Sequence, residues 1–472
     1  MRDVYLSHDA LGLAELVRRR EASPRELLET AIGLAEERHE TLHAVVVPFF
    51  ERALDAVDRL PDGPLRGVPF LLKDLQAALA GVPMTNGSRL FRDYLPSFTA
   101  ELVERYQRAG LSIFGRTASP ELGVTTTTES ALYGATRNPW SLEHTAGGSS
   151  GGAAAAVAAG IVPAAHASDG GGSIRIPASC CGLVGLKPSR GRVSLAPDKG
   201  EGWGGMSVNH ALSRTVRDSA ALLDVVAGNV AGDPYAAPHQ ERPFLAEVGA
   251  DPGRLRVAWT TEAFNDAETD AECATAVRRA AELLGSLGHQ VEEARPGIDG
   301  RALADAARVI VGANLRLALE ERARELGKEL EPSDVEPITW STATSVDGRP
   351  LTAYPRAVQA IHAIGRTLGR FFASWDLLLT PTMPAPPQHL GALSLSHPEP
   401  QVFLANLKRT IGFTQLMNAA GNPAISLPLH WTAEGLPVGV QLAAPLGGEA
   451  TLLRVAAQLE EAAPWRDRRP PA

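Results

Sequence analysis

The chain has few cysteines and no apolar run long enough to cross a membrane. Only Cys180, Cys181 and Cys273 occur among 472 residues, and their spacing forms neither a C-x-x-C pair nor a zinc site. The longest apolar stretch, residues 153–167, is rich in alanine, contains Pro163 and is too short for a bilayer. We therefore expect reduced, buried cysteines and no metal centre, and the pattern excludes a disulfide-stapled secreted domain.

The chain also has fewer basic residues than acidic ones. The chain carries 45 lysines and arginines against 54 acidic residues, a net charge of −9, and the basic residues are scattered along it. A nucleic-acid-binding surface needs a basic patch or stripe, so the charge balance argues against that partner. The first residues lack the basic and apolar segments of a secretory signal. We expect a cytoplasmic protein with neither a nucleic-acid nor a membrane partner.

Patterns typical of helices and strands alternate along the chain, with no internal repeat and no flexible linker. Ser23, Pro24 and Glu26 form the signature of a capping box at the start of a helix. Strands are predicted within residues 63–74 and at 111–115, 255–259, 289–293, 376–380, 424–428 and 438–443. Further helices are predicted at 99–109, 153–160, 213–227, 271–287, 300–328, 353–373, 401–420 and 449–462.

Strands separated by helices favour a partly parallel sheet. We expect an α/β protein with a single domain over residues 1–472, in which a large mixed β-sheet is sandwiched between helix layers. Residues 296–373 are predicted to be an inserted helical cap that lines the substrate pocket.

Glycines and serines gather in two short segments on either side of the alanine run. The first reads GGSSGG at 147–152 and the second reads DGGGS at 169–173, so Ser149 and Ser173 each follow a glycine. Glycine lets the main chain approach a reacting atom closely, and main-chain amides beside a hydroxyl can form an oxyanion hole. The two segments predict acyl-transfer chemistry.

Lys73 is one of only five lysines and follows the apolar run 68–72. Burial disfavours the ammonium form and lowers the pKa of a lysine, which turns it into a general base near neutral pH. The same pattern fits a lysine that reaches the surface from the end of a strand. The residues alone leave both interpretations open.

Other nucleophile systems and a non-enzymatic role are alternatives. Gly147-x-Ser149-x-Gly151 formally matches the nucleophile elbow of α/β-hydrolases, which needs a strand directly before the serine. The preceding residues contain Pro139 and show no strand pattern, and no lysine has a serine three residues before it. A glycine-rich anion-binding module is disfavoured because residues 182–188 lack the spacing of a phosphate-binding loop.

Taken together, the motifs resemble the amidase signature family. The matching segments are GVPFLLKD at 67–74, GGSSGG at 147–152, DGGGSIR at 169–175, CGLVGLKP at 181–188, LLLTPTMP at 377–384 and GLPVGVQ at 435–441. The resemblance implies hydrolysis of a carboxylic amide without a cofactor, through an acyl-enzyme. It implies Ser173 as the nucleophile, Ser149 as a bridging serine after a cis peptide bond, and Lys73 as the base.

The resemblance also implies roles for neighbouring residues. The amides of Gly170, Gly171, Gly172 and Ser173 would bind the oxyanion. Ser150, Asp169 and Arg175 would support the two segments. Thr125, Thr126 and Asn314 are candidate substrate contacts. The threonines are also typical of a plain strand. Asn314, Trp340 and Tyr354 are also compatible with core packing alone.

Within the family, the chain is more similar to stand-alone amidases than to the A subunit of tRNA-dependent glutamine amidotransferases. That subunit usually has a glutamine where this chain has Ile176. The stand-alone group includes 6-aminohexanoate cyclic dimer hydrolases and aryl acylamidases, so a small-molecule amide, cyclic or aryl, is the expected substrate. A glutamine-hydrolysing A-type subunit and a biosynthetic amidase or esterase are the alternatives, and a homodimer is left open.

Overall fold

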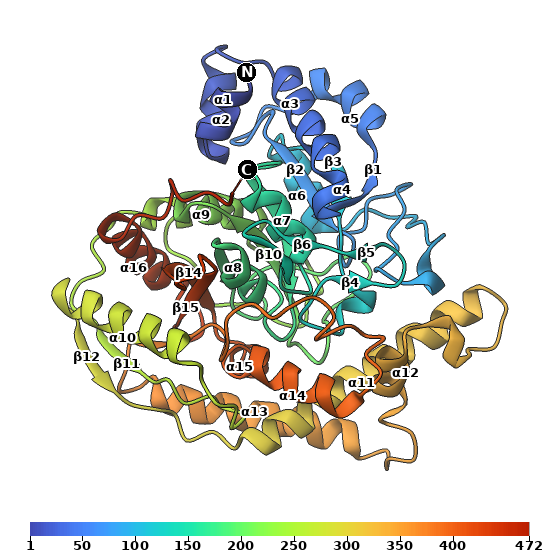
Figure 1. Ribbon diagram of the computed structural model, residues 1–472, viewed down its shortest axis with the longest axis vertical. Coiled ribbons are helices and arrows are strands. Elements are labelled where there is room, and N and C mark those ends of the chain that lie inside the picture. The colour runs from blue at the N-terminus through green and yellow to red at the C-terminus, as the bar shows by residue number, and fades with distance from the viewer. Residues whose placement is uncertain (472) are drawn as a thin grey trace.

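An eleven-stranded mixed β-sheet runs through the protein, which the computed structural model describes over residues 1–471 (Figure 1). In spatial order its strands are β1 (Val45–Pro48), β3 (Ser112–Thr117), β2 (Pro69–Lys73), β8 (Ala164–Asp169), β10 (Val208–Ser213), β9 (Val184–Lys187), β14 (Ala424–Trp431), β15 (Pro437–Ala443), β13 (Leu377–Pro381), β11 (Arg256–Trp259) and β12 (Gln290–Glu293). Strand β2 is parallel to β3 and β8, and β11 is parallel to β12 and β13. The other pairs are antiparallel, so the predicted mixed sheet is confirmed.

Two smaller sheets lie beside the main one. Strands β4 (Glu129–Ser130) and β5 (Gly134–Ala135) form the first, and β6 (Arg137–Asn138) and β7 (Ser141–Thr145) form the second. Strand β7 ends four residues before Ser149. The prediction that no strand precedes this serine was therefore wrong, although β7 pairs with β6 and not with the main sheet.

The helices cover both faces of the sheet, and further helices lie at the two ends of the molecule. They are α1 (Arg2–Ser7), α2 (Ala10–Arg18), α3 (Pro24–Glu37), α4 (His39–Leu42), α5 (Phe50–Ala56), α6 (Glu101–Arg108), α7 (Gly151–Ala158), α8 (Arg175–Cys181), α9 (Val216–Val226), α10 (Ala271–Ser286), α11 (Gly300–Glu325), α12 (Pro337–Thr344), α13 (Ala353–Phe371), α14 (Pro400–Ile411), α15 (Gln415–Ala420) and α16 (Glu449–Ala462). Figure 1 shows α1–α3 at one end of the molecule and α11–α13 at the other. Among residues 1–471, none of the helices combines the length and apolarity needed to cross a bilayer.

Helix α7 shows why the alanine run between the two glycine-serine segments is so uniform. All of its residues are buried, and it packs against β8 and the neighbouring α8. A Cβ atom at Gly152 would collide with the main chain of Ala118, so only small residues let the helix approach this closely. The helix thereby holds the two segments at a defined separation.

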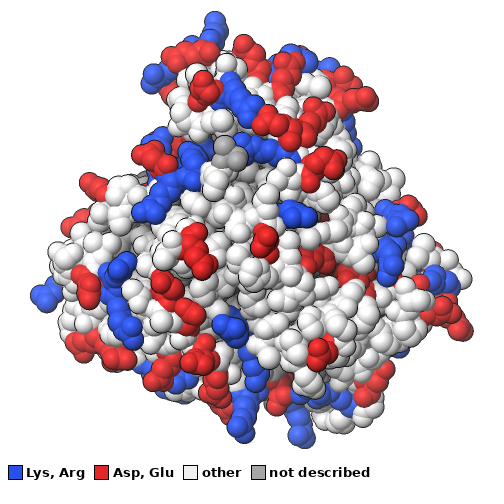
Figure 2. All heavy atoms as spheres, in the orientation of Figure 1, with Lys and Arg blue, Asp and Glu red and all other residues white. Residues whose placement is uncertain are grey.

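Local signals predicted helix starts well. The capping box is present at α3, where the Ser23 side chain accepts from the Glu26 amide and the Glu26 carboxylate accepts from the Ser23 amide. The three cysteines are buried and unpaired with one another, as expected. Over most of the face drawn in Figure 2, acidic and basic side chains are interspersed.

Three predictions of secondary structure differ from the structure. The predicted helix 401–420 is broken into α14 and α15, because the carbonyl groups of Gly412 and Thr414 accept from Phe264 N and Arg175 Nη1. No helix was predicted between the helical stretches 300–328 and 353–373, but this segment contains α12, which begins at Pro337. The predicted helix 213–227 begins later, at Val216, since Ser213 belongs to β10.

Candidate active site

Lys73 lies at the end of β2 and is fully buried. Its Nζ donates to Ser149 Oγ at 2.7 Å and to Ser168 Oγ at 3.0 Å. The side chain therefore does not reach the surface, and of the two interpretations left open by the sequence the structure favours the buried lysine.

Burial has a direct effect on the charge of Lys73. Desolvation lowers the pKa of Lys73 to about 7, and the negative charge of Asp169 offsets part of this shift. At neutral pH a large fraction of the side chain is therefore an unprotonated amine that can accept a proton. This protonation state is the one that a general base requires.

Ser149 occupies the turn between β7 and α7. The peptide bond Gly148–Ser149 is cis, as the resemblance implied. A Cβ atom on Gly148 would collide with the main chain of Thr127, so glycine is required for this close approach. The Thr128 hydroxyl supports the turn, because Oγ1 donates to Gly147 O at 3.0 Å and accepts from Gly151 N at 3.0 Å.

The hydroxyl groups of the two threonines predicted to contact substrate are both engaged. Thr125 Oγ1 donates to Leu393 O at 3.0 Å, and Thr126 Oγ1 lies 2.8 Å from Thr410 Oγ1. Their segment is not a strand. Their role as substrate contacts stays a prediction.

The segment that carries Ser173 connects β8 to α8, and Asp169 organises it. The Asp169 carboxylate accepts from Gly172 N at 2.8 Å, from Ile174 N at 3.1 Å and from the Arg175 guanidinium at 2.9 and 3.0 Å. Burial alone would raise the pKa of Asp169, but the Arg175 charge holds it well below its usual range. Asp169 is consequently ionised, and its carboxylate fixes the path of the main chain around the serine.

Arg175 joins this segment to distant parts of the chain. Its Nη1 donates to Thr414 O at 2.9 Å and to Gln441 Oε1 at 2.7 Å, and its Nη2 donates to Asn418 Oδ1 at 2.6 Å. Asn418 Nδ2 in turn donates to the Asp169 carboxylate at 2.8 Å. Sequence reasoning missed Asn418, and it quoted Gln441 only as part of a motif, because nothing local links them to Arg175.

The glycines of the segment differ in their surroundings. A Cβ atom at Gly170 would lie 2.7 Å from the Trp203 ring, one at Gly172 would lie 2.5 Å from Thr414 Oγ1, and one at Gly171 would meet no atom within 4 Å. Open space therefore lies over Gly171. The Gly172 amide already donates to Asp169, so the prediction that it binds the oxyanion is corrected by the structure.

Two further serines lie at the site. Ser150 Oγ donates to Ser168 O at 3.2 Å and accepts from Ser168 N at 3.3 Å, which fits its predicted supporting position. Ser168 was missed by the sequence analysis. Its position directly before Asp169, at the end of a strand next to the lysine strand, is the signal that could have identified it.

Asn314 lies inside the helical segment rather than beside the serines. Its Nδ2 donates to Ile310 O at 2.8 Å in α11 and lies 3.5 Å from the Tyr354 hydroxyl of α13. A Cβ atom on Gly204 would come within 4 Å of both Ile310 and Tyr354, and Trp203 next to it covers Gly170. The cap therefore reaches the site through the Trp203 loop, while its role in lining a pocket stays a prediction.

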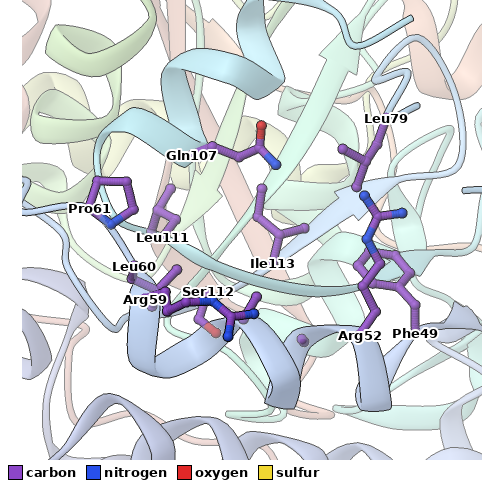
Figure 3. A pocket seen from close by; sticks show the side chains of 12 residues that line it. Phe49, Arg52, Arg59, Leu60, Pro61, Leu79, Gln107, Leu111, Ser112 and Ile113 are labelled. Carbon is purple, nitrogen blue, oxygen red and sulfur yellow. The ribbon is translucent and has the colours of Figure 1, made fainter. Parts of the chain in front are cut away.

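A sizeable cavity lies elsewhere in the molecule. A pocket of about 290 Å³ lies between α5 and β3. Arg52, Arg59 and Ile113 are among the side chains that line it (Figure 3). It contains none of the predicted site residues. Hydrogen bonding and burial, and not cavity size, identify the candidate active site.

Comparison with known proteins agrees with this geometry. Residues 26–453 match the family model described as Amidase. The chain is 39% identical to a 6-aminohexanoate-cyclic-dimer hydrolase of Paenarthrobacter ureafaciens over 100% of this chain and 98% of that protein. A solved structure of 6-aminohexanoate cyclic dimer hydrolase complexed with substrate has a TM-score of 0.95 at 39% identity, covering 98% of this chain and 99% of that one. A bacterial aryl acylamidase of the amidase signature family has a TM-score of 0.89 at 28% identity, with 97% of both chains covered.

Proposed function

Because the chain belongs to the amidase signature family and is an amide hydrolase, we propose that it cleaves its substrate through an acyl-enzyme on Ser173. The observation that carries this proposal is the 2.7 Å hydrogen bond between Lys73 Nζ and Ser149 Oγ, made by a fully buried lysine. A buried amine next to a hydroxyl forms the start of a proton path.

In the first step the neutral Lys73 amine accepts the proton of Ser149. Ser149 accepts the Ser173 proton as Ser173 Oγ attacks the amide carbon, so a C–O bond forms and the carbonyl π bond opens onto oxygen. The amides of Gly170, Gly171 and Ser173 bind the developing oxyanion, and one such donor contributes about 3 kcal/mol to the transition state.

In the second step the tetrahedral intermediate collapses and the C–N bond breaks. Ser149 donates a proton to the leaving amine and recovers one from the Lys73 ammonium. Water then attacks the ester carbon of the acyl-enzyme, its proton returns along the same path, and the carboxylate product leaves with Ser173 restored.

The proposed substrate is a small, uncharged or weakly polar amide, with cyclic aliphatic amides first and aryl amides second. Two facts support this choice: the similarity to a cyclic-dimer hydrolase over the whole chain, and the open space over Gly171 beside the Trp203 ring. A glutamine-hydrolysing A-type subunit is disfavoured because this chain has Ile176 where that subunit usually has a glutamine. A cytoplasmic location and a homodimer stay predictions.

The experiment compares Ser173→Ala with Ser286→Ala, a serine on α10 away from the site. Each is assayed on a panel of cyclic, linear and aryl amides and esters, and each is labelled with a fluorophosphonate. We expect Ser173→Ala to lose hydrolysis and labelling, while Ser286→Ala keeps both, with the label on the peptide that contains Ser173. Hydrolysis at the wild-type rate by Ser173→Ala would refute the proposed nucleophile.

A further inference from the structure

The N–H of Lys73 is bound by a side chain and not by a main-chain carbonyl, although the residue itself is paired with Thr117 of β3. Strand β2 pairs with β8 at Leu71 and Ala165. Beyond this pair the Lys73 N–H donates to the Nδ1 atom of His166 at 3.2 Å. An imidazole thus takes the place of a ladder bond at the residue proposed as the base.

This contact determines the tautomer of His166. Since the Lys73 N–H is a donor, Nδ1 must carry a lone pair, and the ring proton must lie on Nε2. Nε2 lies 3.1 Å from Asn209 Oδ1, which accepts that proton. Both ring nitrogens therefore have a partner of the correct kind, and only the neutral imidazole satisfies both.

The position of His166 on β8 explains how it reaches Lys73. His166 and Ser168 are two residues apart and share one face of the strand. Asn209 of β10 is paired directly with Ser168, so it lies on the same face. Strand β8 therefore contacts Lys73 at both ends of the residue, at its N–H through His166 and at its ammonium through Ser168.

The groups around the imidazole favour its neutral form. Burial lowers the pKa of His166 to about 3, and the positive charges of Lys73 and Arg116 lower it further, against a raising effect of the Asn209 hydrogen bond. Of the other titratable groups nearby, Tyr106 on α6 has its ring centroid 6.3 Å from the imidazole, and His210 on β10 is paired with Ala167 and so lies on the opposite face of the sheet. Helix α7, packed on β8, contributes only glycine, alanine and valine.

We propose that His166 is a positioning residue for the base, with Asn209 holding its imidazole in the tautomer that accepts the Lys73 N–H. This arrangement fixes the backbone from which the lysine side chain extends toward Ser149. The proposal rests on the proposed function, in which Lys73 is the base.

The experiment compares His166→Ala, His166→Asn and His210→Asn. Asparagine at 166 places an acceptor oxygen near the position of Nδ1, whereas alanine removes the acceptor. His210 is the matched control, since it is also a fully buried histidine on an adjacent strand but bonds Ser219 Oγ and not Lys73. Measurements are kcat, KM and the pH profile on one amide, the rate of fluorophosphonate labelling, and Tm.

We expect His166→Ala to lower kcat by about 10- to 100-fold with KM changed less than about threefold, the range for residues that orient a functional group. Its labelling rate should fall in parallel, and its acidic pKa in the kcat profile should move. His166→Asn should recover most of the loss, and His210→Asn should keep wild-type kcat and pH profile. Asn209→Leu, which removes only the acceptor at Nε2, tests the same idea if His166→Ala does not fold, with an expected loss of about three- to tenfold.

Wild-type kcat and pH profile in a folded His166→Ala, or equal losses in His166→Ala and His210→Asn, would overturn the proposal. Failure of the proposed function gives a different result. If Lys73 is not the base, Lys73→Met would retain activity. If only the positioning role of His166 is wrong, Lys73→Met would be inactive and His166→Ala would be fully active.

Discussion

Two regions of the sheet each bury a lysine, and only one of them has the partners of a base. Lys73 at the end of β2 and Lys187 at the end of β9 are both fully buried, and burial lowers the pKa of each to about 7. Lys73 Nζ bonds the hydroxyls of Ser149 and Ser168, whereas Lys187 Nζ donates to the Pro188 carbonyl at 2.8 Å. A hydroxyl can release a proton to an amine and a carbonyl cannot. A lowered pKa therefore makes a lysine available as a base, but its partner decides whether it acts as one.

The largest expected effect comes from replacing each lysine by methionine, which keeps most of the volume. Lys73→Met should lower kcat about 1,000-fold or more because the proton acceptor is lost. Lys187→Met should retain activity within about threefold, since Lys187 contacts no residue of the proton path. Steady-state kinetics of the two variants with matched Tm values make the comparison. Similar losses in both would mean that burial, and not the hydroxyl partner, matters.

The charge of Asp169 acts on both buried lysines, and disruption of its ion pair with Arg175 should have the next largest effect. Arg175→Lys keeps the charge but cannot reproduce the hydrogen bonds of the guanidinium to Asp169, Asn418 and Gln441. We expect kcat to fall about 10- to 100-fold and Tm to decrease, because buried polar partners lose their donors. Kinetics together with thermal unfolding measure both. An unchanged kcat in Arg175→Lys would contradict this prediction, because it would mean that catalysis does not depend on these hydrogen bonds around Asp169.

The pH profile of the wild-type enzyme is the third test of the comparison. The pKa of Lys73 is lowered to about 7, so the neutral base is present above this value and is protonated below it. The rate constant kcat/KM should therefore fall about tenfold per pH unit below pH 7. Lys187→Met should show the same acidic limb, because Lys187 does not take part. If the acidic limb disappears in Lys187→Met, the titrating group is Lys187 and not Lys73, which would contradict the prediction.

The smallest expected effect is on stability, and it is tested at Lys187 because its replacement leaves the proposed base Lys73, which has the same lowered pKa, in place. The pKa of Lys187 in the folded protein, about 7, is lower than the ordinary lysine value of 10.5, so the unfolded chain binds the proton more readily between these values. The cost of burying Lys187 is absent above about pH 10.5, grows as the pH falls and is complete below about pH 7. Lys187→Met should therefore raise Tm by about 2 °C at pH 6.5, with the gain shrinking toward pH 10. Thermal unfolding of variant and wild type at several pH values measures this difference, and a pH-independent difference would contradict it.

Residues in short local motifs were the ones that could be predicted. Ser149, Ser173 and Lys73 each stand in a segment whose neighbours carry the pattern, and the resemblance named their roles and the cis peptide bond. The roles themselves stay proposals. Strand β2 was also predictable, because five consecutive buried positions give a continuous apolar run up to the lysine.

Residues that act across long distances in the chain were missed. The break between α14 and α15 arises because the Thr414 carbonyl accepts a hydrogen bond from Arg175, which is 239 residues away in the sequence. The hydrogen bond from the Gly172 amide to Asp169 and the one from the Lys73 amide to His166 depend on which atoms meet after folding. The periodicity of apolar residues in the sequence does not predict such contacts. Propensity and pattern describe a segment, whereas these hydrogen bonds join several segments at once.

The amino-acid sequence shows which residue types are available for the chemistry and where glycines gather beside serines. The reason for glycine at 148 comes from the fold, because a Cβ there would collide with the main chain of Thr127. Only the tertiary structure decided the protonation and the partners of Lys73. Strands β3 and β8 enclose it, α7 packs behind them, and the resulting loss of water lowers its pKa. Desolvation depends on everything that surrounds a group, so it cannot be read from the segment in which the group stands.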